Sequence, residues 1–439
     1  MSANLSCDFE GYLSLSTDQM PNRRALFAYV LFAGLVLLSP RSAPAQTTEA
    51  ATTGPAVQIF TARNSGTSLP IFSLLERPLN FSVSLSAGYD DNVDTTFSAQ
   101  DSFYTSLGLN VSYSFGTERT QATLSTNASV AYYENGGEGD GFEYQPNLAL
   151  SLGVGHGVSE RLSLSGNVFV KYSMEPDLAI EASRNRRSGN YFYTAESISA
   201  VYLLLERWST VTSASFSSIQ YDDQSIGSFQ DRFQYGFSQQ VRYLVLPVLT
   251  ATGEYRLGLV RYDSSGRDST TYSLLAGADQ TLGPRTSGSL RVGAEFRNSD
   301  QGNTTAVNPY VDTTLNLTLG DRTSVSFSAR YATEESDIIE SPSRQTFRTG
   351  LSVAYGLTPR IGSSLSAYYR HDMNDESSSI FLTEEASTED ALDISLNLSY
   401  SINPRISANA GYNRSEVFSD SNFRSYSRNR YSGGVSVSF

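Results

Sequence analysis

The chain has 439 residues, of which 31 are Lys or Arg and 45 are Asp or Glu, so its formal net charge is -14 at pH 7. Nucleic-acid binding is excluded as an expected function, because a protein that neutralises phosphates needs a basic surface. Charged residues make up only 17% of the chain and the mean hydropathy is -0.27, which excludes a helical membrane protein and a typical disordered acidic chain.

Residues 1–45 have the features of a secretory signal peptide. Two arginines at 23–24 precede an unbroken apolar run over 25–38, which is too short to cross a bilayer comfortably. The small-x-small pattern at 43–45 fits the rule for signal peptidase, so we expect cleavage directly after it. Met20 is an alternative start, because the residues before it carry none of these features.

The next segment, residues 46–78, is rich in Thr, Ala, Ser and Gly and has no sustained period. We interpret it as a periplasmic leader. Cleavage of the signal peptide removes Cys7, the only cysteine. An exported chain without disulfides must obtain its rigidity from hydrogen bonding and packing, which a closed sheet provides.

From residue 79 onward, apolar and polar residues alternate along short runs. In the first run, Phe81 and Val83 alternate with Ser82 and Ser84, which is the period of a strand with one apolar and one polar face. No amphipathic helix of comparable strength interrupts these runs. Further clear runs are 103–115, 148–154, 162–172, 290–296 and 392–400, whereas 191–205 and 211–221 alternate poorly.

Short and long connections alternate between the runs. Eight tight turns and nine longer polar loops give seventeen connections and therefore eighteen strands, with sixteen as the alternative if the poorly alternating runs are not strands. We predict an all-β fold, a transmembrane antiparallel up-and-down barrel of the bacterial outer-membrane type over 79–439. The turns lie near 117, 159, 206, 247, 284, 321, 359 and 404, and the loops near 91, 137, 183, 225, 265, 302, 340, 379 and 420.

Aromatic residues cluster where the runs end. Alternation also describes a soluble β-sandwich, so the placement of the aromatic rings distinguishes the two folds. Aromatic rings that keep one edge in contact with water form girdles at both membrane interfaces, and this repeated placement favours a membrane barrel. The tyrosines and phenylalanine concerned are Tyr89, Tyr113, Phe115, Tyr132, Tyr172, Tyr221, Tyr331, Tyr355, Tyr369, Tyr400 and Tyr412.

The final run, "RYSGGVSVSF", ends at the last residue of the chain. A terminal phenylalanine preceded by alternate apolar positions resembles the recognition strand read by the outer-membrane barrel assembly machinery. The resemblance implies that machinery as a partner, together with outer-membrane lipid and lipopolysaccharide. The expected assembly signal consists of Tyr431, Gly433, Val435, Val437 and Phe439.

Catalytic chemistry has little support in the sequence. Only two histidines are present, and His156 falls at an expected turn while His371 falls at the opposite end of a run. A Ser-His-Asp arrangement needs these groups within hydrogen-bond reach, and the opposite rims of a barrel do not provide it. No G-x-S-x-G, H-E-x-x-H or P-loop pattern is present. We expect no enzyme activity, no catalytic residue and no cofactor.

The stretch "SAGYDDNV", residues 86–93, raises the question of a carboxylate pair at an active site. The strand phase places Tyr89 on the lipid face at the outer rim and aims Asp90 inward. Asp91 and Asn92 then open the first surface loop. We interpret the stretch as a strand-to-loop exit.

Acidic pairs also suggest calcium, which prefers several oxygen ligands. The candidates besides Asp90 and Asp91 are "GGEGDG" at 136–141 and the pair at 222–223. None has the fixed spacing of a known loop motif. We interpret them as solvated loops and predict no metal site.

The inward face of the central strands carries charged residues. Charges there are tolerated because the lumen is wet, and eighteen strands leave room for an aqueous channel. Such a wall would contact anionic or hydroxyl-rich solutes; alternatively, its Arg and Glu side chains pair across strands and brace the barrel. The lumen-facing candidates are Arg242, Glu254, Arg256, Arg291, Glu295, Arg297, Arg330 and Arg348.

A first strand ending in "GYDDNV" after a signal peptide and leader, followed by Tyr-rich hairpins and a terminal Phe, resembles the putative β-barrel porin type 2 family over residues 79–439. That resemblance implies an outer-membrane barrel. That family includes barrels encoded with capsule and exopolysaccharide synthesis genes, so the resemblance implies passage of polymer across the outer membrane as one expected function.

Three functions are therefore compared. The first is a porin-like channel for exopolysaccharide export or for passage of small solutes. The second is a non-conducting surface or structural barrel that acts through its acidic outer loops, as an adhesin or receptor. The third, an outer-membrane enzyme that hydrolyses lipid or peptide, has the least support.

Overall fold

The structure is a computed structural model, and the residues it describes are 79–135, 144–177, 189–263, 266–281, 285–300, 304–338, 341, 343–375, 387–420 and 422–439. The expected signal peptide (1–45), the leader (46–78) and the "GGEGDG" stretch lie outside these residues. Within the described ranges, no helix has the length and apolar character needed to cross a membrane.

The described part of the chain forms one antiparallel sheet of eighteen strands, which confirms the predicted number and fold class. The strands follow one another around the sheet in chain order. They are β1 (Leu79–Asp90), β2 (Ser102–Gly116), β3 (Thr120–Tyr133), β4 (Tyr144–Gly157), β5 (Leu162–Ser173), β6 (Tyr191–Leu205), β7 (Trp208–Tyr221), β8 (Arg232–Leu246), β9 (Leu249–Tyr262), β10 (Ser269–Thr281), β11 (Thr286–Ser299), β12 (Thr304–Leu319), β13 (Thr323–Glu334), β14 (Arg344–Gly356), β15 (Ile361–Asn374), β16 (Thr388–Ser401), β17 (Ile406–Ser419) and β18 (Tyr426–Ser438).

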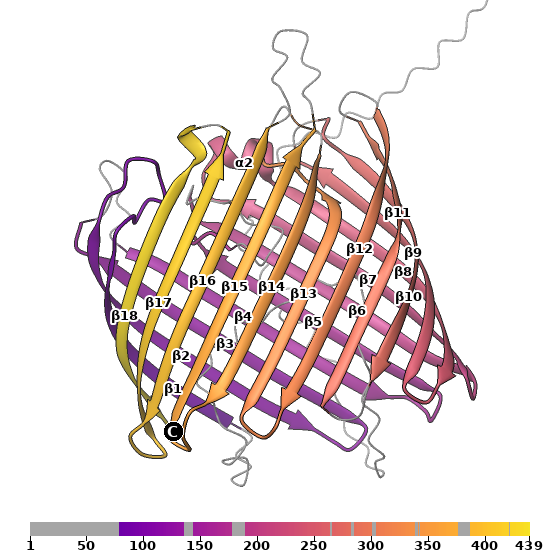
Figure 1. The fold of residues 1–439 in the computed structure, drawn as a ribbon, viewed down its shortest axis with the longest axis horizontal. Helices are drawn as coiled ribbons and strands as arrows, with labels where there is room; N and C mark the ends of the chain where they lie inside the picture. Colours follow the sequence, from indigo (N-terminus) through magenta and orange to yellow (C-terminus); the bar gives the residue numbers. More distant parts are fainter. Residues whose placement is uncertain are drawn as a thin grey trace, which may run out of the picture. The chain divides into compact units, whose positions relative to one another are not determined.

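The sheet closes on itself because β1 pairs with both β2 and β18 (Figure 1). The register at this seam runs from Ser82 opposite Ser438 to Asp90 opposite Arg430. Closure gives the backbone N–H and C=O groups of both terminal strands hydrogen-bond partners, so the barrel presents no sheet edge to lipid.

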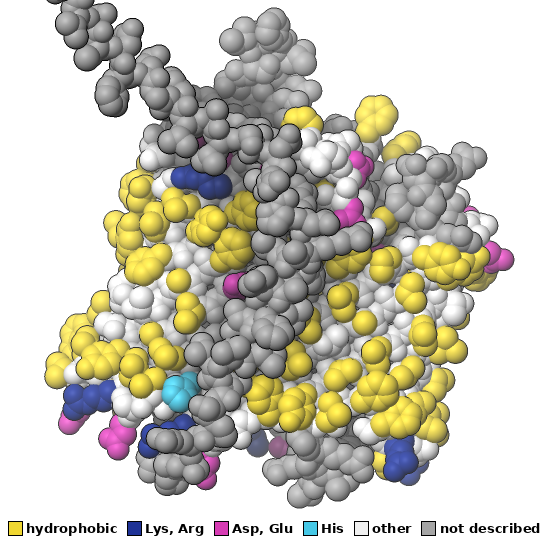
Figure 2. Space-filling model, turned by 180° about the vertical axis from the view of Figure 1, so that it is seen from behind, with side chains coloured by type: hydrophobic (Ala, Val, Ile, Leu, Met, Phe, Trp, Pro, Cys, Tyr) yellow, Lys and Arg dark blue, Asp and Glu magenta, His cyan; other side chains and the backbone are white. Residues whose placement is uncertain are grey.

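The period-two pattern of the sequence sorts the side chains onto two faces. Leu85 of β1 stands between Leu107 of β2 and Val435 of β18, and all three are exposed, by 58%, 54% and 45%. The alternate residues, such as Ser84 and Ser86, lie on the inner face. Figure 2 shows hydrophobic side chains spread over the outer surface, with most of the visible charged side chains near its two ends. This is the distribution that a hydrocarbon layer requires.

The connections alternate between short and long as the sequence predicts, except that the expected long loop near 302 spans only 300–303, no more than the turn 282–285. In the turn after β2, Thr117 and Thr120 exchange backbone hydrogen bonds. One long connection holds a helix that the sequence did not predict, α2 (Gln224–Gln230). The carboxylate of Asp223 accepts a hydrogen bond from the Ser225 backbone at 2.8 Å and caps this helix. A second short element, the 3-10 helix η3 (Asn422–Arg424), precedes β18.

Aromatic residues pair between neighbouring strands on the outer face. Tyr89 and Phe103 have ring centroids 5.2 Å apart, and Tyr412 and Tyr431 have centroids 5.0 Å apart. At the other end of the seam, the backbone N–H of Phe439 donates to the carbonyl of Phe81 at 2.8 Å. The last residue of the chain therefore takes part in closing the barrel.

Candidate solute pathway through the barrel

The two aspartates of "SAGYDDNV" lie at the seam between β1 and β18. Asp90 is fully buried, and its Oδ1 atom accepts a hydrogen bond from Nε of Arg428 at 2.9 Å. The Arg428 guanidinium also donates to Glu175, in the connection after β5, at 2.8 Å. Asp90 is thus part of a buried ion-pair cluster.

The next two residues fasten the same two strands. The carboxylate of Asp91 accepts hydrogen bonds from the backbone N–H of Asn429 at 2.6 Å and from its side-chain amide at 2.7 Å. The amide of Asn92 donates to the carbonyl of Ser427 at 3.0 Å. β1 ends at Asp90, so the stretch is the strand-to-loop exit expected from the sequence, but its carboxylates are hydrogen-bonded across the seam and Asp90 is not solvated. The stretch is a clasp that holds the first strand to the last.

Several of the expected lumen-facing residues form what we call the mid-wall cluster, on β8 to β11. Glu254 pairs with Arg256 at 2.6 Å and lies 3.7 Å from Arg291. Asp279 pairs with Arg291 at 2.7 Å and with Arg242 at 3.7 Å. Glu254 and Arg256 both lie on β9, whereas the other three contacts join different strands, as in the bracing alternative for the wall.

The remaining expected residues lie further along the same wall. The guanidinium of Arg256 donates to the Tyr310 hydroxyl at 2.7 Å, and Arg330 lies over the same ring at 5.8 Å. Glu295 accepts a hydrogen bond from the backbone of Thr333 at 2.9 Å. These contacts link β9, β11, β12 and β13 through polar groups.

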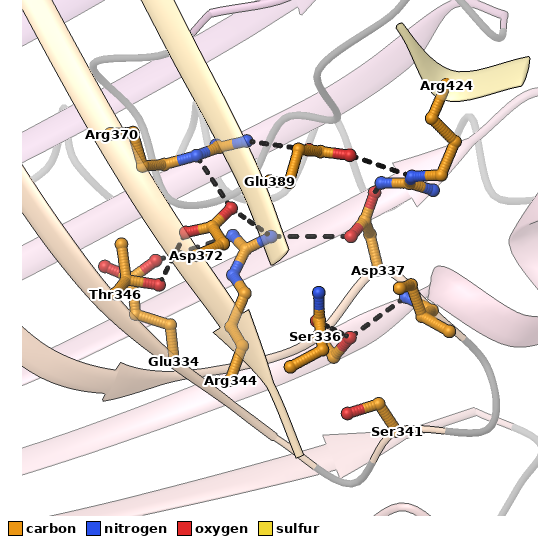
Figure 3. Close-up of polar contacts among 12 residues, drawn as sticks. Glu334, Ser336, Asp337, Ser341, Arg344, Thr346, Arg370, Asp372, Glu389 and Arg424 are labelled. Atoms are coloured by element: carbon orange, nitrogen blue, oxygen red, sulfur yellow. Dashed lines mark hydrogen bonds and ion pairs between the residues drawn. The ribbon is translucent and has the colours of Figure 1, made fainter. Parts of the chain in front are cut away.

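Near the long-loop ends of β13 to β16, a larger group of charges forms what we call the outer-mouth network (Figure 3). Arg344 is its centre: its guanidinium lies 3.5 Å from Glu334, 3.4 Å from Asp337 and 3.3 Å from Asp372. The described members are four carboxylates and four guanidinium groups, so their formal charges cancel. They are Glu334, Asp337, Asp372 and Glu389 with Arg344, Arg348, Arg370 and Arg424.

Sequence reasoning named Arg330 and Arg348 but missed Arg370, which stands in the same row. Arg330 of β13 is opposite Arg348 of β14, which in turn is opposite Arg370 of β15. The guanidinium of Arg370 pairs with Asp372 at 2.9 Å and is 2% exposed. Strand phase was available as a signal, because Tyr369 is on the outer face and its neighbour must point inward.

Toward the short-turn ends of the strands, and apart from the mid-wall cluster, the side chains of the inner wall are polar but uncharged. Hydroxyl and amide groups of neighbouring strands bond to one another there, as in Ser125 with Ser151 at 2.6 Å and Ser289 with Thr314 at 2.8 Å. On the turn-end halves of β13 to β15 the inward residues are small and uncharged. They are Ser324, Ser326, Ser328, Gly350, Ser352, Ala354, Gly362, Ser364 and Ser366.

The inner face of β2 to β7 carries a feature that the sequence interpretation did not include. Tyr104 and Tyr133 stack with centroids 5.3 Å apart, and Phe169 and Tyr193 meet edge to face at 6.2 Å. These rings are buried in two apolar clusters. The lumen therefore has an aromatic side and a charged side near its outer end.

The two histidines lie on different strands, away from one another. His156 of β4 bonds the Thr120 hydroxyl at 2.7 Å, and His371 of β15 bonds Asp390 at 2.8 Å. Among the residues described, no group of three or more His, Cys, Asp and Glu side chains is placed to hold a metal ion. Of the acidic pair at 222–223, Asp222 accepts a hydrogen bond from Tyr172 at 2.6 Å and Asp223 caps α2.

Comparison with known proteins gives one family. The family model described as Putative beta-barrel porin 2 matches residues 79–439, the extent expected from the sequence. No curated protein sequence matches the chain.

Solved structures of outer-membrane proteins are similar to this chain at low sequence identity. OpdK of Pseudomonas aeruginosa, solved with vanillate, has a TM-score of 0.43 at 11% identity, covering 82% of this chain and 99% of that chain. A BenF-like porin from Pseudomonas fluorescens Pf-5 has a TM-score of 0.44 at 11% identity, with 82% and 98% covered. The siderophore receptor PirA of P. aeruginosa has a TM-score of 0.41 at 11% identity, with 83% and 81% covered.

Proposed function

Because the chain belongs to the family described as Putative beta-barrel porin 2, we propose that its barrel is a channel through which hydrophilic solutes cross the outer membrane. We propose further that an extended exopolysaccharide chain is one such solute. No step of this function calls for catalysis or a cofactor.

The observation that carries the proposal is the polarity of the inner wall. Hydroxyl, amide and charged groups point inward from strands all around the barrel, while the alternate residues form the apolar outer face. A lumen that held lipid or a packed apolar core would not support this pattern, because unpaired polar groups cost free energy in an apolar medium. Water-filled barrels of this size conduct solutes.

The neutral part of the wall supports the choice of a polysaccharide. Serine, threonine and asparagine side chains donate to and accept from sugar hydroxyls as they do from water. Each exchange of a water contact for a sugar contact changes the free energy by only about 1 kcal/mol. A polymer that must move needs many weak, replaceable contacts rather than a few strong ones.

Solute uptake by proteoliposomes tests both parts of the proposal. Swelling rates are measured with a neutral monosaccharide and with linear oligosaccharides of increasing length. Uptake that continues for long linear chains supports polymer passage. Uptake restricted to the smallest sugars contradicts polymer passage but upholds a channel for small solutes. No uptake of any sugar contradicts the channel and favours the surface barrel.

A further inference from the structure

We propose that residues 335–338, here called the strap, cross the outer mouth of the barrel, and that the pair formed by Asp337 of the strap and Arg424 selects solutes by charge. The strap follows β13, and the next strand, β14, begins at Arg344. The inference concerns the selectivity of the same pathway and so rests on the proposed function.

The contacts of Asp337 place it across the bore. Its backbone carbonyl accepts a hydrogen bond from the side-chain amide of Gln230 at 3.0 Å, and its carboxylate pairs with Arg424 at 2.7 Å. Gln230 lies between β7 and β8, whereas Arg424 lies between β17 and β18. These two junctions are separated by ten strands in one direction, β8 to β17, and by eight in the other. One residue that touches both therefore lies near the axis of the barrel.

The strap is also fastened where it leaves β13. The carboxylate of Glu335 pairs with Arg297 at 2.7 Å and accepts a hydrogen bond from the Tyr262 hydroxyl at 3.0 Å. The guanidinium of Arg267 donates to the Ser336 carbonyl at 2.6 Å. The strap thus has partners on β9, on β11 and in the connection between β9 and β10.

The far side of the strap is tied to the outer-mouth network. The Ser336 hydroxyl, which is buried, donates to the Asn374 side chain at 2.8 Å. Asp337 also lies 3.4 Å from the Arg344 guanidinium. With ion pairs and hydrogen bonds on both sides, the strap has a fixed position in the mouth.

Differences in exposure identify the groups that a solute meets. The side chains of Asp337 and Arg424 are 13% and 18% exposed, whereas those of Arg344, Asp372 and Glu389 are 4%, 1% and 4% exposed. Arg348 is similarly exposed, at 15%, so the Asp337–Arg424 pair and Arg348 are the most exposed charges of the described network. Because the formal charges of the described network members cancel, removal of either charge of this pair leaves an excess charge of the opposite sign.

This arrangement predicts charge effects of opposite sign for the two members of the pair. Asp337→Asn leaves the network with one excess positive charge and shifts the channel toward anions. Arg424→Gln leaves one excess negative charge and shifts it toward cations. A unit charge about 8 Å from a passing ion in water changes the permeability of that ion by about two- to threefold, in opposite directions for cations and anions, so their permeability ratio changes by about sixfold.

Reversal potentials in planar bilayers under a KCl gradient measure these shifts. Arg285→Gln is the matched control, because Arg285 lies in the turn between β10 and β11 at the other end of the barrel, where it is 62% exposed and pairs with Asp321 of the turn between β12 and β13. We expect opposite shifts for the Asp337 and Arg424 variants and none for the control. Shifts of the same sign, or equal shifts in the control, would overturn the proposal.

Thiol cross-linking tests the position of the strap without requiring conduction. The variant Gln230→Cys with Asp337→Cys should be joined by a short bis-thiosulfonate reagent in the folded full-length chain. The control, Gln230→Cys with Asp321→Cys, should not be joined. Absence of a link in the first variant overturns the strap even if the channel conducts. If the two cysteines are cross-linked but the barrel does not conduct, the position of the strap across the mouth is upheld. Charge selection by the Asp337–Arg424 pair is then contradicted together with the proposed channel function.

Discussion

The Asp90 carboxylate and the Arg428 guanidinium form a buried pair that joins β1 to β18, with Nε of Arg428 2.9 Å from Oδ1 of Asp90. The two residues are 338 positions apart in the chain. Their contact exists only after every intervening strand is in place, so it stabilises the closed barrel and no smaller unit. The acidic stretch that first suggested chemistry is a structural clasp.

Asp90→Asn tests the energetic weight of this clasp. The variant leaves a buried guanidinium with Glu175 as its remaining carboxylate partner. Loss of one member of a buried pair costs on the order of 3 kcal/mol, so the free energy of unfolding should fall by about that amount. Urea titration of the barrel in lipid vesicles measures it. Asp321→Asn, at an exposed pair, serves as the control and should leave the unfolding midpoint unchanged.

A second prediction concerns the seam between β1 and β18, where the backbones of the two strands lie close together at Gly88. A Cβ atom at Gly88 would lie 2.0 Å from the carbonyl oxygen of Tyr431 and 2.6 Å from the ring of Tyr104. Gly88→Ala should therefore destabilise the barrel by roughly 1–3 kcal/mol, the usual cost of overpacking. Gly433→Ala is the matched control on β18, because a Cβ there meets nothing within 4 Å. Equal unfolding midpoints for the two variants would contradict this account of the seam.

The strap should respond to acid through Glu335. Burial alone would raise the pKa of the Glu335 carboxyl, but the charges of Arg297 and Arg232 and hydrogen bonds from Arg297 and Tyr262 outweigh it and lower that pKa below its usual value. The stabilisation is therefore fully present above the unfolded pKa of about 4.3 and is lost as the pH falls through the folded value.

Limited proteolysis between pH 7 and pH 3 with an acid-active protease measures this effect. The wild-type strap should become cleavable only at the acidic end of that range. Glu335→Gln should be cleavable at every pH, because it lacks the titrating carboxylate. A wild-type profile that does not change with pH would exclude Glu335 as an anchor of the strap.

The terminal phenylalanine has a proposed role in assembly that is separate from its contacts. The Phe439 ring is 59% exposed and lies 5.6 Å from the ring of Phe81. If it belongs to an assembly signal with Tyr431, Gly433, Val435 and Val437, Phe439→Ala should lower the amount of folded barrel in the outer membrane while the unfolding midpoint of the purified barrel changes little. Leu319→Ala, at a similarly exposed position beside a turn, is the control. Equal yields for both variants would argue against a signal.

Strand number, strand direction and the alternation of short and long connections could be predicted from the sequence because they depend on local patterns. Period-two alternation and turn residues are visible within a few positions of one another. The strands at 191–205 and 211–221 were the weakest predictions. They form β6 and β7 because their backbones pair with neighbours on both sides, whatever their own patterns.

The partners of the charged residues could not be predicted in the same way. Arg428 and Asp337 acquire their roles from residues on distant strands and connections, and no local pattern records that pairing. The helix α2 was missed because seven residues between two strands carry no sustained helical period. Strand phase would have identified Arg370 as an inward-facing residue. The inward folding of the strap could be recognised only from the structure.

Single-channel recording of the purified barrel in planar bilayers tests the central claim most directly. Wild-type protein is compared with a variant in which residues 335–338 are replaced by a short Gly-Ser connection. We expect discrete conductance steps for the wild type and larger steps for the variant, because the strap narrows a water-filled passage. Absence of steps in both proteins, with the barrel shown to be folded, would contradict the claim that this family member is a channel.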